Sequence, residues 1–158
     1  MLRISRLTDY ATVVLATLAG EPERVQTATS LSERTRIAAP TVSKLLKQLH
    51  RANLVTSTRG LHGGYQLARP AAQISAAAIL DALEGGPVTL TDCAAGEGHC
   101  EIEGHCRVGR GWQRLNLAVR RSLEDVSLAQ LAGLDAPGTR LPTLEREVKP
   151  PTPRSPVR

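Results

Sequence analysis

Apolar side chains in the first third of the chain recur every three or four positions, which is the spacing of an amphipathic helix. We expect a first helix over residues 5–18, ended by Gly20. Thr27 can cap a second helix that runs to about Thr35, and Pro40 suits the first turn of a third. The core-facing stripe of the third helix consists of Val42, Leu45, Leu46 and Leu49. The pattern thus predicts three consecutive short helices.

The spacing changes between Leu54 and Arg69, where two short β-prone runs flank a glycine-rich tip. This segment predicts a β-hairpin, and Val25 is expected to contribute a further short strand. Two helices joined by a tight turn and followed by such a hairpin form a winged helix-turn-helix, which is a DNA-binding motif.

The second half of the chain predicts two more helices. Ser75 can cap a helix that runs to about Glu84, and Gly85 ends it. A last, long helix begins at about Val108, and its apolar side chains can form a helix-packing seam. The seam consists of Val108, Trp112, Leu115, Val119, Leu123 and Val126. The fold class is therefore mainly α with a small β-wing: a winged helix-turn-helix followed by a long C-terminal helix.

Charge divides the chain into unlike parts. Residues 1–70 contain ten Lys or Arg against four acids, whereas residues 71–106 contain six acids and no Lys or Arg. A basic first half favours a polyanionic partner such as nucleic acid. With only three aromatic residues, the chain is unlike proteins that stack single-stranded bases.

Other compositional features bear on location and on the C-terminus. The chain has no long apolar run and no apolar core of a secretion signal, so we expect a cytoplasmic protein without membrane contact. Residues 136–158 hold six of the ten prolines and little apolar content, which predicts a disordered tail.

Eight residues are candidates for contacting DNA. On the third helix, short and basic side chains lie away from the apolar stripe, where they can reach base edges or phosphates. In the hairpin, an arginine beside flexible glycines can enter a narrow minor groove. The candidates are Thr41, Ser43, Lys44, Lys47, Arg59, Gly60, Gly63 and Gly64. The alternative is a solvated helix face and glycines that only shape a turn.

The three cysteines of the chain, Cys93, Cys100 and Cys106, have the spacing C-x6-C-x5-C, and His99 and His105 lie among them. An odd number of cysteines argues against a disulfide framework and fits a reducing compartment. Three thiolates can bind the iron of a cluster or a zinc ion, and either needs at least one further ligand. The alternatives are unligated cysteines and a small Cys/His metalloenzyme. No nucleophile–base constellation or phosphate loop supports an enzyme.

Four segments together resemble the IscR/NsrR-type family of bacterial iron–sulfur-responsive transcriptional regulators, over residues 1 to about 133. They are residues 6–11, the helix-turn-helix, the wing residues 59–65 and the three-cysteine loop before a long helix. Residues 1–10 and 112–116 also resemble the branch associated with regulation of SUF cluster-assembly genes.

The resemblance implies a homodimer on double-stranded promoter DNA, with the long helices crossing. It implies that Cys93, Cys100 and Cys106 hold an iron–sulfur cluster, for which we favour 2Fe–2S over 4Fe–4S. The gap between the first two cysteines is six residues instead of the usual five, and the family's occasional histidine ligand is Gly109 here. Asp9 matches the acidic ligand that some members supply from the partner subunit. The alternatives are that His99 or His105 is the fourth ligand, or that Asp9 is only a favourable charge in the first turn of its helix.

We therefore expect a non-enzymatic DNA-binding transcriptional regulator that senses cluster status and controls SUF-type cluster-assembly genes. Residues 1–70 would bind DNA, residues 71–135 would carry the cluster loop and dimerisation helix within the same domain, and residues 136–158 would form the tail. A zinc- or thiol-based redox repressor of the same fold is the alternative.

Overall fold

The computed structural model describes residues 4–60, 62–96 and 98–134. Most of these residues are helical, and one two-stranded antiparallel sheet forms the wing, so the predicted fold class is confirmed. The elements in chain order are α1 (Arg6–Ala19), α2 (Ala28–Thr35), α3 (Ala39–Arg51), β1 (Val55–Thr58), β2 (Gly64–Leu67), η1 (Ala71–Gln73), α4 (Ala76–Glu84), η2 (Asp92–Ala94), η3 (Glu103–His105), α5 (Gly109–Asp125) and α6 (Leu128–Leu131).

Local hydrogen bonds explain where the helices begin. Ser5, Thr27 and Ser75 each accept the backbone N–H three residues further on, as expected of N-caps. Pro40 lies in the first turn of α3, where its missing N–H costs nothing. Arg36 ends α2 with φ 57°, a left-handed conformation that glycine adopts more easily.

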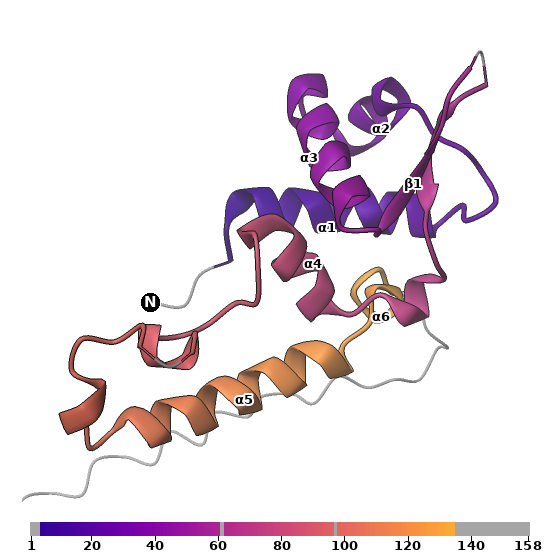
Figure 1. The fold of residues 1–158 in the computed structure, drawn as a ribbon. Helices are drawn as coiled ribbons and strands as arrows, with labels where there is room; N and C mark the ends of the chain where they lie inside the picture. The colour runs from indigo at the N-terminus through magenta and orange to yellow at the C-terminus, as the bar shows by residue number, and fades with distance from the viewer. Residues whose placement is uncertain (1–3, 61, 97, 135–158) are drawn as a thin grey trace, which may run out of the picture.

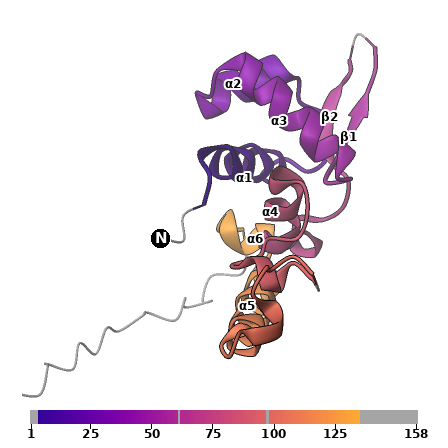
Figure 2. The same cartoon turned by 60° about the vertical axis from the view of Figure 1, so that its left-hand side comes forward.

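The hydrophobic core lies where α1 meets the helix-turn-helix on one side and α4 on the other (Figure 1). The predicted stripe of α3 is fully buried, and Ile74 and Ile79 close the core from the α4 side. Figure 2 shows the resulting order, with α2 and α3 above α1, α4 and α6 below it, and α5 furthest from α2 and α3. Within the described ranges, no helix combines the length and apolar character needed to cross a membrane.

The wing contacts the helices through both of its strands. β1 lies beside α3, where Val55 is buried and its carbonyl oxygen lies 3.1 Å from Nδ1 of His50, and β2 lies beside α1. β1 and β2 pair with Val55 opposite Leu67 and Ser57 opposite Tyr65. Tyr65 also forms an isolated antiparallel bridge with Gln26. The pairing expected from a strand at Val25 is therefore made by Gln26, as a single bridge, because the chain turns into α2 directly afterwards.

The long helix is followed by a short one that the sequence pattern did not predict. α5 ends at Asp125, and Val126, which we had placed in its seam, is an extended C-cap. Ser127 starts α6 through a capping box with Gln130, and Leu128 is fully buried. A four-residue helix is too short to produce a recognisable hydrophobic period. Residues 136–158, expected to form the tail, lie outside the described residues.

Candidate DNA-binding surface and cysteine loop

The outer face of α3 carries the candidate DNA-contacting side chains. Because the apolar stripe faces the core, Lys44 and Lys47 are exposed, and Thr41 and Ser43 are half-buried beside them. The first turn of the helix contains no acid, and its last turn contains His50 and Arg51. This face therefore presents positive charge and short hydroxyl side chains, the groups suited to phosphates and base edges.

The wing tip depends on glycine for its shape. Gly60 has φ 116°, a conformation that L side chains rarely adopt. A Cβ on Gly63 would overlap the carbonyl oxygen of Thr58, and one on Gly64 would lie 2.6 Å from the carbonyl oxygen of Gln26. Arg59 is exposed at the end of β1. The glycines thus permit a close backbone approach that leaves Arg59 free to reach outward.

The cysteines lie in the segment between α4 and α5. Cys93 belongs to η2, and its side chain lies outside the described part of the structure. Cys100 and Cys106 are free and half-buried, whereas His99 and His105 are exposed. Among the described side chains, no group of three or more His, Cys, Asp or Glu is close enough to hold a metal ion.

The start of α5 lies beside the last cysteine. A Cβ built on Gly109 would lie 3.8 Å from the Sγ of Cys106. Position 109 is thus close enough to touch the thiol, but glycine has no side chain to donate. The other proposed ligand, Asp9, is exposed in the first turn of α1 and lines a small pocket with Ile4, Ser5 and Arg6. Among the described side chains of one chain, Asp9 joins no group of three or more potential metal ligands.

Two polar contacts fasten the segment before the cysteines to neighbouring helices. The backbone N–H of Leu90 donates to Oδ1 of Asn116 on α5 at 3.0 Å. The N–H of Val88 donates to Oδ1 of Asp81 on α4 at 3.3 Å. The same carboxyl oxygen accepts Nη1 of Arg120 at 2.7 Å, so Asp81 joins this segment to both helices.

Arg120 is the centre of the contact between α4 and α5. Its Nε also donates to Glu124 at 2.8 Å. The hydrogen bonds that Arg120 donates to Asp81 and then to Glu124 raise the pKa of Arg120 above its usual range. Neither the hydrophobic pattern nor a motif singled out Asp81, Asn116 or Arg120 in the sequence. Their positions in the sequence could have indicated them: Asn116 adjoins the apolar seam, and Asp81 interrupts a run of apolar residues in α4.

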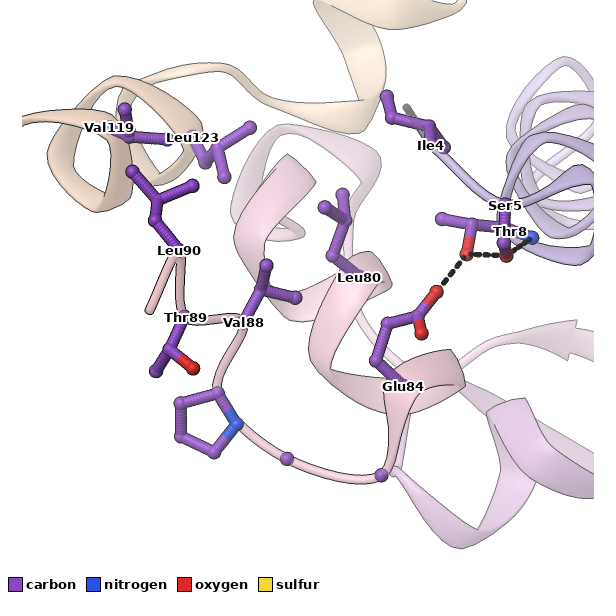
Figure 3. Close-up of a pocket in the computed structure, with 13 residues that line it drawn as sticks. Ile4, Ser5, Thr8, Leu80, Glu84, Val88, Thr89, Leu90, Val119 and Leu123 are labelled. Carbon is purple, nitrogen blue, oxygen red and sulfur yellow. Dashed lines mark hydrogen bonds between the residues drawn. The ribbon is translucent and has the colours of Figure 1, made fainter. Parts of the chain in front are cut away.

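A pocket of about 650 Å³ lies between α1, α4, α5 and the segment after α4 (Figure 3). Apolar side chains of Ile4, Leu80, Val119 and Leu123 contribute to its wall. At one edge the buried Thr8 donates to Oε1 of Glu84 at 3.1 Å, so the pocket borders a direct link between α1 and α4.

Comparison with known proteins decides the class of this molecule. The sequence pattern of the Rrf2 family, described as iron-dependent transcriptional regulators, matches residues 4–133. The chain belongs to the Rrf2 family. Members of this family are transcriptional regulators, not enzymes; they bind DNA and are typically dimeric. The small-metalloenzyme alternative therefore has no support.

Individual relatives agree with this assignment. An HTH-type transcriptional regulator of Haemophilus influenzae is 34% identical over 101 residues, which span 64% of this chain and 66% of the relative. CymR of B. subtilis, the global cysteine regulator, is 28% identical with a TM-score of 0.64, over 86% of this chain and all of CymR. IscR of T. potens is 25% identical with a TM-score of 0.63, over 85% and 89% of the two chains. The resemblance to IscR-type regulators found in the sequence is thus confirmed at the level of the Rrf2 family.

Proposed function

We propose that this Rrf2 protein is a homodimeric transcriptional regulator that senses iron–sulfur cluster status and controls SUF-type cluster-assembly genes. One observation carries the proposal. A basic helix-turn-helix and wing lie at one end of the chain, while a loop of free thiols at the other end is fastened to α5 through Leu90 and Asn116.

The DNA-binding part of the proposal rests on α3 and the wing. The exposed Lys44 and Lys47 would contact phosphates or guanine edges, and Thr41 and Ser43 would contact base edges. Arg59, exposed beside Gly60, would enter the minor groove. In a dimer, the two recognition helices would meet half-sites about one helical turn apart.

Dimerisation explains an apolar surface that a single chain leaves uncovered. None of the described residues of α5 is buried, and Trp112 and Leu115 remain 43% and 46% exposed. Val119 and Leu123 are only half-buried, in the pocket beside α4. A second copy packed along this face would remove these side chains from water, at roughly 25 cal/mol per Å² of apolar surface.

The cysteine loop has the donor chemistry that an iron–sulfur cluster needs. Thiolates are the usual ligands of such clusters, and Cys100 and Cys106 are free thiols without a disulfide. Cys93, Cys100 and Cys106 would hold the cluster, with 2Fe–2S favoured over 4Fe–4S. Asp9 of the partner subunit would be the fourth ligand, since Gly109 offers no donor atom. When bound, the cluster supplies a centre that oxidation, nitric oxide or iron shortage can remove.

The contacts around Asp81 give ligation a physical route to the DNA-binding end. Ligation would order the loop that follows Leu90, and Asn116 and Arg120 would transmit this order to α5 and α4. Glu84 then connects α4 to Thr8 on α1. Sensing on this route means that the cluster favours one of two dimer geometries, and a coupling of about 1–3 kcal/mol is typical of such systems.

The proposal assigns DNA binding to residues 1–70 and cluster binding and dimerisation to residues 71–135 of one domain. A cytoplasmic location remains a prediction. One alternative sensor has specific support: the similarity to CymR, a cysteine regulator, favours a zinc- or thiol-based redox repressor with the same DNA surface.

Anaerobic purification tests the proposal. We expect a brown protein with visible absorbance and equal iron and sulfide content, lost when any one cysteine is changed to serine. A colourless protein that contains zinc, or no metal, would instead establish the alternative sensor. A gel-shift assay tests the DNA surface in both cases. The unmodified protein should bind DNA, and Lys44→Ala or Lys47→Ala should weaken this binding.

The fourth ligand is tested on the same material. A carboxylate is a harder, weaker ligand for iron than a thiolate, so Asp9→Ala should give a cluster that assembles but decays faster with shifted absorbance. His99→Ala and His105→Ala are the matched controls and should leave the spectrum unchanged. A native spectrum for Asp9→Ala beside a changed one for either histidine variant would place the ligand in the loop.

A further inference from the structure

Gln26 is a buried polar residue at the junction of the wing and two helices. Its exposed fraction is 2%, and it lies between α1 and α2, directly before the N-cap Thr27. Burying an amide costs free energy unless its groups are hydrogen-bonded, so its partners show what the residue does.

The backbone of Gln26 holds the wing. Its N–H donates to the carbonyl oxygen of Tyr65 at 2.9 Å, and the N–H of Tyr65 donates back at 2.8 Å. β2 therefore pairs with β1 along one edge and with this single residue along the other. Gly64 permits the approach, since a Cβ there would lie 2.6 Å from the Gln26 carbonyl oxygen.

The side chain of Gln26 holds the helices. Its Oε1 accepts Nη1 of Arg34 on α2 at 2.7 Å, and its Nε2 makes a longer contact of 3.5 Å to the carbonyl oxygen of Thr17 on α1. Nη2 of Arg34 pairs with Oε1 of Glu21 at 2.7 Å. Hydrogen bonds from Arg24 and then Arg34 lower the pKa of Glu21 below its usual range.

We propose that Gln26, oriented by Arg34, sets the angle of the wing relative to α3 and is a positioning residue for the wing's contact with DNA. The argument is geometric: Tyr65 faces Ser57 in the sheet, and Arg59 follows two residues after Ser57. β1 is fixed at its start by the buried Val55, so a change at the bridge opposite Ser57 would tilt the outer part of the wing and Arg59 with it, while α3 keeps its own buried stripe. The inference rests on the proposed DNA-binding function of α3 and the wing.

A double-mutant cycle tests it, using the duplex DNA that the unmodified protein selects from a random-sequence library. Gln26→Leu keeps the buried volume and the net charge, and a buried residue cannot itself touch DNA. We expect binding to weaken roughly three- to thirtyfold. Because Gln26 acts through the wing, the effect should nearly vanish in an Arg59→Ala background and persist in full in a Lys44→Ala background.

Arg34→Met is the second variant, in case Gln26→Leu does not fold, because it leaves the backbone bridge intact. Arg24→Met is its matched control, since Arg24 also pairs with Glu21 but makes no contact with Gln26. We expect Arg34→Met to weaken DNA binding and this loss of affinity nearly to vanish in the Arg59→Ala background. Arg24→Met should show no such dependence on Arg59. A direct phosphate contact by Arg34 would instead give effects that add to those of Arg59→Ala.

The outcomes separate this inference from the proposed function. Folded Gln26→Leu protein with unchanged affinity, equal losses in both backgrounds, or an Arg59→Ala variant that binds normally would each overturn the positioning role while DNA binding through Lys44 stands. An unmodified protein that selects no DNA would overturn both.

Discussion

The side-chain oxygen of Asn116 accepts the backbone N–H of Leu90 at 3.0 Å. Leu90 lies three residues before Cys93, so this bond fixes the entry to the cysteine loop against the helix that carries the exposed apolar seam. The proposed sensing centre would use this anchor, because a contact to a rigid element can transmit an order–disorder change of the loop.

We expect Asn116→Ala to loosen the cysteine loop. A partly buried N–H left without a partner costs roughly 1–3 kcal/mol, so the Leu90 amide should exchange its hydrogen faster and the cluster should be lost sooner. Amide exchange of the metal-free protein and anaerobic decay of the visible absorbance measure the two effects. Ser122→Ala is the control, since that hydroxyl bonds only within α5. Unchanged Leu90 exchange would contradict the anchoring role.

Arg120→Met should weaken the joint between α4 and α5. The side chains of Arg120 and Asp81 are only 27% and 24% exposed, so removing the cation leaves a shielded carboxylate. We expect the free energy of unfolding, measured with urea, to fall by roughly 1–3 kcal/mol. Glu124→Gln, which removes the more exposed i,i+4 partner, should cost at most about 0.5 kcal/mol. Equal losses for the two variants would argue against a special role of the Asp81 contact.

Leu115→Glu and Leu117→Glu form a matched pair on α5. Both leucines are exposed in the single chain, but only Leu115 belongs to the predicted seam. Burying a charge in the seam is costly, so Leu115→Glu should be monomeric and bind DNA poorly, while Leu117→Glu should remain dimeric. Light scattering at micromolar concentration reports the mass. Dimeric Leu115→Glu protein would mean that another surface joins the subunits.

Arg36→Gly should stabilise the fold. Arg36 is left-handed at the end of α2, and glycine adopts this conformation without a steric penalty. The free energy of unfolding should rise by roughly 0.5–1 kcal/mol. Gly85→Ala is the reciprocal case at the end of α4, where φ is 81° and no atom lies within 4 Å of an added Cβ, and it should destabilise by a similar amount. Stabilisation by Gly85→Ala would show that backbone conformation does not govern these helix ends.

Much of the fold is determined locally, and the sequence alone therefore predicts it. The N-caps Ser5, Thr27 and Ser75 bond to an N–H three residues away, and Pro40 and Gly85 act through their own backbone. The spacing of the hydrophobic residues then distinguishes the helices from the hairpin. The α3 candidates Thr41, Ser43, Lys44 and Lys47 could be proposed for the same reason, since the outward face of α3 follows from the position of its buried stripe. The four wing candidates follow from the glycine-rich tip between the two β-prone runs.

Only the tertiary structure shows how these elements are joined. Asn116 meets Leu90 across 26 residues of sequence, and Arg120 meets Asp81 across 39. The Gln26–Tyr65 bridge, which replaced the strand expected at Val25, depends likewise on two segments far apart in the chain. Periodicity reports which face of an element is buried but not which polar partner lies opposite. A polar contact between distant segments forms only when packing brings them together, so its partners are decided by the tertiary structure.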